Sequence, residues 1–187
     1  TFRGQEATGE YAQLDSAEWT LKYEHSDDQK RLSKQLLENF QNGIDSLVHA
    51  VCGSGKTEIY SHLAEETLSQ GRNVLYLVPE IAMSRQLEER LYRYFGDKLL
   101  TFHSAQSAAG KRNIAEIIRK KEPGSDDSYI VLGTRSSLFL PHHNLGLIII
   151  DEEHDGSYKQ DSPAPRYNGR DSALMLAVIH DANVILG

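Results

Sequence analysis

The amino-acid sequence predicts an α/β fold in which helices cover both faces of a mostly parallel sheet. Runs of consecutive aliphatic residues, the longest at residues 145–150, are typical of strands that are buried on both sides. Between these runs, apolar residues recur every three or four positions, which is the pattern of an amphipathic helix. Strands that alternate with helices in this way form a parallel sheet. The length of 187 residues fits one substantial domain.

The first expected helix begins after Ser26, because Ser26 and Gln29 have the spacing of a capping box. Four apolar residues then share one face, and Asn42-Gly43 ends the helix. The next expected elements are a strand at residues 44–51, a helix at 56–70 that Gly71 ends, and a strand at 73–78 that Pro79 ends.

The alternation continues through the second half of the chain. The expected elements there are a helix at 84–95 before Gly96, a strand at 99–102, a helix around Ile114 and Ile118 that ends before Pro123, strands at 129–132, 145–150 and 183–186, and a helix at 170–179. Residues 1–24 show no clear periodicity, and we expect them to be a linker or the edge of a preceding domain. This leaves residues 25–187 as the predicted domain.

Composition excludes several classes of protein. The apolar run at residues 145–150 is far too short to span a bilayer, so no membrane role is expected. Cys52 is the only cysteine, which excludes an internal disulfide and a cysteine-rich zinc site and favours a cytoplasmic protein. With 27 acidic and 20 basic residues the net charge is −7. Any contact with nucleic acid must therefore come from a local basic patch.

The segment AVCGSGKTEIY, residues 50–60, has the form of a phosphate-binding loop with alanine in place of the first glycine. It stands between a predicted strand and a predicted helix, where backbone N–H groups face an anion. The lysine would reach the β- and γ-phosphates of ATP, and the threonine hydroxyl would bind Mg²⁺. The expected nucleotide-binding residues are Gly53, Ser54, Gly55, Lys56 and Thr57. Cys52, inside the loop, is expected to be a small filler rather than a nucleophile.

The acidic run DEEH follows the most hydrophobic predicted strand directly. That strand would carry Asp151 to the carboxyl edge of the sheet, where α/β sheets bind their ligands. There Asp151 can hold Mg²⁺, and Glu152 can orient or deprotonate the water that attacks the γ-phosphate. Combined with the phosphate loop upstream, this run predicts an enzyme that hydrolyses ATP.

Several segments together resemble the superfamily-two helicases, and among them the PriA family of bacterial primosomal helicases. They are VPEI at residues 78–81, FHS at 102–104, GTRSSLF at 133–139, DEEHDGSYKQ at 151–160 and RYNGRD at 166–171. The resemblance runs in unbroken order from about residue 25 to residue 187. It implies a RecA-like P-loop NTPase domain, the first ATPase lobe of a 3′-to-5′ DNA helicase that acts in replication restart.

This resemblance also implies roles for single residues. Gln29 would contact the adenine, although it can equally be a simple helix cap. Thr134 and Arg135 would grip single-stranded DNA, although an exposed salt bridge is the alternative for Arg135. His154 would connect the ATP site to the elements that sense DNA, whereas a metal role for His142-His143 is not expected. The other residues implied on the DNA side are Pro79, Glu80, Tyr158, Arg166 and Tyr167.

The loop that holds these aromatic residues couples DNA binding to hydrolysis in the family. Here it departs from the family pattern, because DSPAP at residues 161–165 stands where many relatives carry an aromatic residue. Tyr158 and Tyr167 are both expected to stack on bases. How strongly this loop couples DNA binding to ATP hydrolysis is therefore an open question.

The resemblance finally implies partners and missing parts. The cofactors would be ATP and Mg²⁺, with zinc only in a part of the longer protein outside this chain. The partners would be single-stranded and forked DNA, a second helicase lobe, a DNA-binding domain of the same protein, and primosome and single-strand-binding proteins. The second lobe supplies an arginine to hydrolysis, so this chain alone is expected to be nearly inactive.

Three other functions fit the sequence less well. A ComFA-type DNA-uptake ATPase is suggested by AVCGSGKTE, but GTRSSLF and DEEH argue against it. A P-loop kinase would need an arginine-rich lid, and a GTPase a guanine-binding Asn-Lys-x-Asp box; the sequence has neither. A binding module with a degenerate site is disfavoured because the lysine, threonine and both acids of the ATP site are intact.

Overall fold

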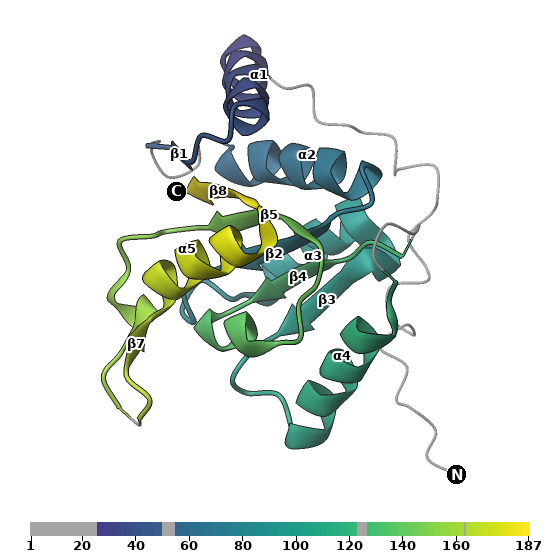
Figure 1. Cartoon of the computed structure of the whole chain (residues 1–187), viewed down its shortest axis with the longest axis vertical. Coiled ribbons are helices and arrows are strands. Elements are labelled where there is room, and N and C mark those ends of the chain that lie inside the picture. The colour runs from purple at the N-terminus through teal and green to yellow at the C-terminus, as the bar shows by residue number, and fades with distance from the viewer. Residues whose placement is uncertain (1–25, 50–54, 123–126, 163) are drawn as a thin grey trace.

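The computed structural model describes residues 26–49, 55–122, 127–162 and 164–187. Within these ranges the chain forms a parallel sheet of six strands with helices on both faces (Figure 1). The predicted α/β fold is confirmed. No helix in the described ranges is long and apolar enough to cross a bilayer.

The strands of the sheet lie in the spatial order β1-β8-β5-β2-β4-β3. Their bounds are β1 (Ser46–Leu47), β2 (Asn73–Leu77), β3 (Leu99–Phe102), β4 (Ile130–Gly133), β5 (Leu145–Ile150) and β8 (Asn183–Leu186). The helices are α1 (Asp27–Gln41), α2 (Lys56–Ser69), α3 (Arg85–Phe95), α4 (Ala108–Lys120) and α5 (Gly169–His180). Short 3-10 helices form at η2 (Gly96–Lys98), η3 (Arg135–Phe139) and η4 (Gly156–Tyr158). A separate antiparallel hairpin joins β6 (Lys159–Gln160) to β7 (Tyr167–Asn168).

Two hydrophobic cores lie on opposite faces of the sheet. Alternate residues of β2 show the division, since Val74 and Tyr76 pack with α1, α2 and α3, while Leu75 and Leu77 pack with α4, α5 and η3. All five residues of β2 are buried, which is the pattern expected for a central strand covered on both sides. The centre of the sheet is therefore covered by apolar side chains on both faces.

The predicted strand at residues 44–51 is wrong in its length. Within the described residues only Ser46 and Leu47 form β1, and Val48 adds one hydrogen bond to the carbonyl of Leu186. Ile44 is 51% exposed, and its N–H donates to Asn39 at the end of α1. Because β1 lies at the sheet edge and pairs only with β8, an apolar run is not enough to extend it.

The turn after β4 depends on a glycine. A Cβ at Gly133 would lie 2.4 Å from the Ser137 hydroxyl, which itself donates to the carbonyl of Thr134. Only a residue without a side chain lets η3 fold back so closely onto the strand. The predicted strand-to-helix turn at Thr134 and Arg135 is present, and the helix that follows is a short 3-10 helix.

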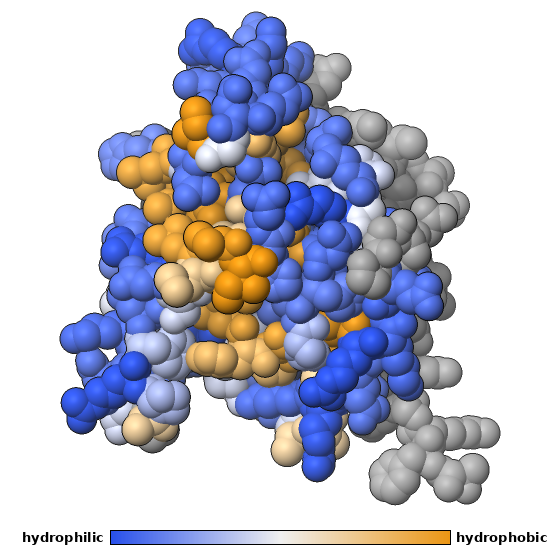
Figure 2. Space-filling model, viewed as in Figure 1, coloured by the Kyte–Doolittle hydropathy of each residue, from blue (hydrophilic) through white to orange (hydrophobic). Residues whose placement is uncertain are grey.

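One face of α5 is apolar and open to solvent. Met175, Val178 and Ile179 are 66%, 80% and 74% exposed. Figure 2 shows an apolar patch over this helix. On its other face α5 buries Ala173 and Ala177 against β5 and β8.

Candidate nucleotide and DNA site

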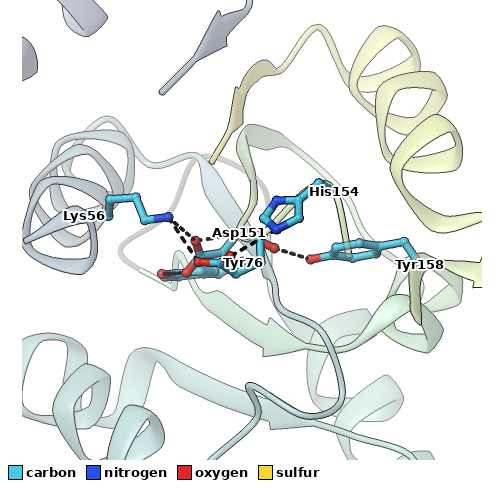
Figure 3. Close-up of polar contacts among 6 residues, drawn as sticks. Lys56, Tyr76, Asp151, His154 and Tyr158 are labelled. Carbon is cyan, nitrogen blue, oxygen red and sulfur yellow. Dashed lines mark hydrogen bonds and ion pairs between the residues drawn. The ribbon is translucent and has the colours of Figure 1, made fainter. Parts of the chain in front are cut away.

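The carboxyl edge of the sheet brings Lys56 next to the acidic run. Lys56 opens α2, and Asp151 follows β5 directly. The Lys56 ammonium lies 3.1 Å from Glu152 Oε1 and 3.9 Å from Asp151 Oδ1 (Figure 3). The side chains of Lys56 and Asp151 are only 14% and 16% exposed. Two groups 95 positions apart in the sequence therefore form one partly buried charge cluster, as the parallel topology predicts.

Both carboxylate oxygens of Asp151 are held by hydrogen bonds. The Tyr76 hydroxyl donates to Oδ2 at 3.1 Å, and the backbone N–H of Glu152 donates to Oδ1 at 3.1 Å. Burial raises the pKa of Asp151, while Lys56 and the Tyr76 hydrogen bond oppose that shift. A carboxylate that is largely buried and fixed at both oxygens is well suited to hold a cation.

Glu152 has a backbone conformation that is unusual for its residue type. Its φ is +49°, in the left-handed region that costs a residue with a side chain about 1–2 kcal/mol. The turn it makes points its carboxylate at Lys56 on one side and at His154 on the other, where Nε2 lies 3.7 Å from Oε2. Strain of this kind concentrates at functional sites. The His154 side chain is 74% exposed, and Glu152 is the acidic group that it contacts within the described residues.

Most of the predicted phosphate loop, including Gly53 and Ser54, lies outside the described residues. Gly55, its last glycine, has a φ of +83°, and a Cβ there would lie 2.0 Å from Gln29 Nε2. The Gln29 amide thus packs directly against the loop. Its Oε1 also accepts from Ser26 N at 2.9 Å, so the predicted capping box is confirmed. Contact with adenine remains a prediction for Gln29.

The donor set fits Mg²⁺ chemistry. Asp151 and Glu152 supply carboxylate oxygens, and the partly buried Thr57 supplies a hydroxyl beside Lys56. Magnesium in nucleotide sites is held by one or two carboxylates together with substrate phosphates, and a cage made wholly of protein ligands is not needed. These residues can hold the ion of a Mg-nucleotide.

The residues predicted on the DNA side end neighbouring strands at the same edge. Pro79 and Glu80 follow β2, and Thr134 and Arg135 follow β4, which pairs with β2. Glu80 is exposed, whereas Pro79 and Thr134 are buried, so contact through the last two must involve their backbone or a small movement.

Arg135 is committed to a structural contact. Its guanidinium donates to the carbonyl oxygens of Ser157 and Lys159, the latter at 3.1 Å. Since Ser157 lies in η4 and Lys159 begins β6, Arg135 ties η3 to the start of the β6–β7 hairpin. An exposed salt bridge is the alternative role expected for Arg135. Instead, its guanidinium makes hydrogen bonds to backbone carbonyls.

The expectation that Tyr158 stacks on bases is wrong for this conformation. Tyr158 is 2% exposed, and its hydroxyl donates to the carbonyl of Asp151 at 2.8 Å (Figure 3). A Cβ at Gly169 would lie 3.2 Å from the Tyr158 ring, so the start of α5 covers the ring as well. A ring that is buried on the sheet cannot offer its face to a base.

Tyr167 keeps an accessible position. It is half-buried on β7, and its ring meets Phe139 edge to face with centroids 5.1 Å apart. Phe139 is 67% exposed, and Arg166 beside Tyr167 is also exposed. Phe139 was missed from the sequence, because an aromatic residue in a short turn has no periodicity that marks it as exposed.

The sequence motifs also do not point to Tyr76, although one feature of its strand distinguishes this residue. It is the one polar side chain among the aliphatic residues of VLYLV, residues 74–78. A hydroxyl in the middle of a central strand requires a hydrogen-bond partner, but only the folded structure shows that this partner is Asp151.

Comparison with known proteins agrees with this geometry. The family described as type III restriction enzyme, res subunit, matches residues 22–182. The replication restart protein PriA of Rickettsia typhi is 47% identical over 141 residues, which are 75% of this chain and 21% of that protein. PriA of Helicobacter pylori is 45% identical over 151 residues, 81% of this chain and 23% of that protein. The chain thus spans about a fifth of the length of these curated relatives.

Solved structures with the same fold are more distant in sequence. A nuclease-deletion mutant of the Type ISP restriction-modification enzyme LlaGI, in complex with a DNA substrate mimic, has a TM-score of 0.60 at 14% identity, over 87% of this chain and 17% of that one. The DUF1998 helicase MrfA has a TM-score of 0.57 at 20% identity, over 91% of this chain and 27% of that one. The predicted RecA-like fold is confirmed, and the chain belongs to the family of the type III restriction enzyme res subunit, in which it is a homologue of the PriA replication restart proteins.

Proposed function

We propose that this chain is the ATP-binding lobe of a DNA helicase that acts in replication restart and moves 3′-to-5′ along single-stranded DNA. The observation that carries the proposal is the convergence of Lys56 with Asp151 and Glu152 at one sheet edge. The identity of 42–47% to PriA proteins supports the choice of a helicase over other P-loop enzymes.

Lys56 has two sets of partners in this proposal. In the structure its ammonium lies 3.9 Å from Asp151 Oδ1 and 3.1 Å from Glu152 Oε1. With ATP bound, the ammonium would make charge-assisted hydrogen bonds to the β- and γ-phosphates. Glu152 would then be free to accept a hydrogen bond from the attacking water, and Thr57 and Asp151 would hold the Mg²⁺, which would supply charge neutralisation.

The same edge would bind single-stranded DNA. We propose contacts from Glu80 and from the backbone of Pro79 and Thr134, with Arg166 and Tyr167 reaching the strand from the hairpin. Support comes from their position beside the ATP cluster and from the exposure of Arg166. Arg135 would act mainly by holding the hairpin in place. His154, next to Glu152, would relay changes between the two sites.

The wider assembly is also a proposal. Residues 25–187 would be the first RecA-like lobe, and residues 1–24 a linker or the edge of another domain. A second lobe would supply an arginine whose absence slows phosphoryl transfer by on the order of 10³ to 10⁵ in related enzymes, so the chain alone would hydrolyse ATP slowly. Forked DNA, primosome proteins and single-strand-binding proteins would be partners of the longer protein. A ComFA-type DNA-uptake ATPase is the second candidate, suggested by the sequence AVCGSGKTE.

Calorimetric titration with Mg-ATP tests the nucleotide site. Lys56→Ala removes the buried cation that faces the phosphates and should weaken affinity by about tenfold or more, because charged hydrogen bonds contribute roughly 1.5–3 kcal/mol each. Lys120→Ala is the matched control, since Lys120 is exposed at the far end of α4. Equal affinities of the parent and Lys56→Ala would remove this cluster from nucleotide binding.

A further inference from the structure

The hydroxyl of Tyr76 contacts a residue that the proposed function assigns to magnesium. It donates to Asp151 Oδ2 at 3.1 Å. Tyr76 is fully buried on β2, the strand next to β5. One buried hydroxyl on β2 therefore holds the carboxylate that directly follows β5.

The hydrogen bonds to Asp151 suit a cation. A phenol has a single hydrogen, and Tyr76 gives it to Oδ2 of Asp151. Oδ1 accepts from the backbone N–H of Glu152. Each carboxylate oxygen can accept more than one hydrogen bond, so the oriented carboxylate keeps lone pairs that can face a metal ion.

The Tyr76 ring has little freedom to move. Tyr60 of α2 meets it edge to face, with centroids 5.9 Å apart and an interplanar angle of 84°. Both rings are completely buried in the core between the sheet and α2. The hydroxyl is thus held at a fixed point, and it fixes the Asp151 oxygen that it contacts.

We propose that Tyr76 is a positioning residue for Mg²⁺, which orients the Asp151 carboxylate so that it presents oxygen lone pairs to the ion. This inference rests on the proposed function, because it takes Asp151 as a magnesium ligand. Residues that orient metal ligands typically change metal affinity or activity by about 10–100-fold when they are replaced. Tyr76 acts through its neighbours and touches neither the nucleotide nor the water.

The test is the Mg²⁺ dependence of ATP binding to the chain, measured by calorimetry in EDTA and at a series of Mg²⁺ concentrations. Tyr76→Phe should leave the affinity in EDTA within about twofold of the parent and raise the Mg²⁺ midpoint by about tenfold. Tyr129→Phe is the matched control, because Tyr129 is also fully buried and its hydroxyl has no hydrogen-bond partner among the described residues. That control should keep the parental midpoint.

Asp151→Asn separates this inference from the proposed function. It should raise the midpoint by itself, and adding Tyr76→Phe to it should produce no further rise, since the two residues act as one unit. A shift in Asp151→Asn with a parental midpoint in Tyr76→Phe would overturn the positioning role and leave the proposed site intact. An equal loss of affinity with and without Mg²⁺ in Tyr76→Phe would show a purely structural role and also overturn it. A parental midpoint in both variants would overturn the magnesium site together with the inference.

Discussion

Asp151 and Lys56 illustrate the balance between burial and charge at this site. Removing a carboxylate from water is costly, and the cost is visible as a raised pKa of Asp151. The ammonium of Lys56, the Tyr76 hydroxyl and the Glu152 N–H offset part of it. Such a group gains from any cation placed beside it, which is the property that a magnesium ligand needs.

The buried side chain of His142 predicts that the stability of the fold depends on pH. Its Nε2 donates to the carbonyl of Ser137 at 2.8 Å, and its buried Nδ1 has no partner among the described residues. Burial lowers the pKa of His142 to about 4, and the neighbouring His143 and His180 disfavour its charge as well. The folded state therefore holds a neutral ring that the unfolded state protonates near pH 6.5.

The lowered pKa of His142 sets the direction in which stability changes with pH. Stability from His142 is complete above about pH 6.5 and is lost as the pH falls toward 4, by up to about 3 kcal/mol for a shift of this size. Urea unfolding of the parent and of His142→Gln, which can still donate to Ser137, should show a flatter pH profile for the variant. His49→Gln, at an exposed position, is the control. Parallel profiles for the parent and His142→Gln would contradict the assignment.

Helix boundaries were predictable because local chemistry sets them. Ser26 and Gln29 cap α1, Ser84 caps α3 through a hydrogen bond to Leu87 N, and left-handed glycines follow the ends of α2 and α3. Strand pairing was less predictable. The two-residue strands β6 and β7 have no periodicity, and they are held by Arg135 across a separation of more than twenty residues.

The hairpin formed by β6 and β7 gives a prediction for DNA binding. Arg166 is exposed on it, whereas Arg135 is committed to its carbonyl groups. Arg166→Ala should weaken binding of single-stranded DNA and reduce the salt slope by about 1, as expected for one lost phosphate contact. Arg135→Ala should weaken binding too, and should also speed backbone hydrogen exchange in the turn at residues 156–160, which loses its anchor.

Fluorescence anisotropy over a range of salt concentrations measures both effects. Arg119→Ala, at an exposed position on α4 away from the hairpin, is the control that should behave like the parent. If the double variant Arg135→Ala/Arg166→Ala binds DNA as tightly as the parent, the hairpin is not the contact surface.

At the scale of the whole molecule, the sheet topology explains why the alternation of strands and helices predicts where the motifs meet. Parallel strands end at one edge, so the motifs after β2, β4 and β5 meet there although they are far apart in the chain. The pattern could not reveal which side chains are buried at that edge. Tyr158 is expected from the sequence to contact bases, yet it is buried, and its hydroxyl donates to the backbone carbonyl of Asp151, while the Tyr76 hydroxyl donates to the Asp151 carboxylate.

The acidic character of the chain does not exclude the proposed binding of phosphates and DNA at the carboxyl edge of the sheet. The net charge is −7, but the residues that face the proposed phosphates and the DNA include Lys56 and Arg166, and several acids pair with bases within single helices. Exposed charges farther than about 10 Å are largely screened, so distant acids contribute little at the carboxyl edge.

Amide hydrogen exchange with and without Mg-ATP tests the central claim most directly, because it locates the ligand on the chain. The account predicts slower exchange in peptides that cover residues 55–60 and 150–154, with unchanged exchange at the opposite edge around residues 119–122. Lys56→Ala should abolish this protection at the same ATP concentration. Protection at another face, or undiminished protection in Lys56→Ala, would contradict the placement of the nucleotide between Lys56 and the acidic run.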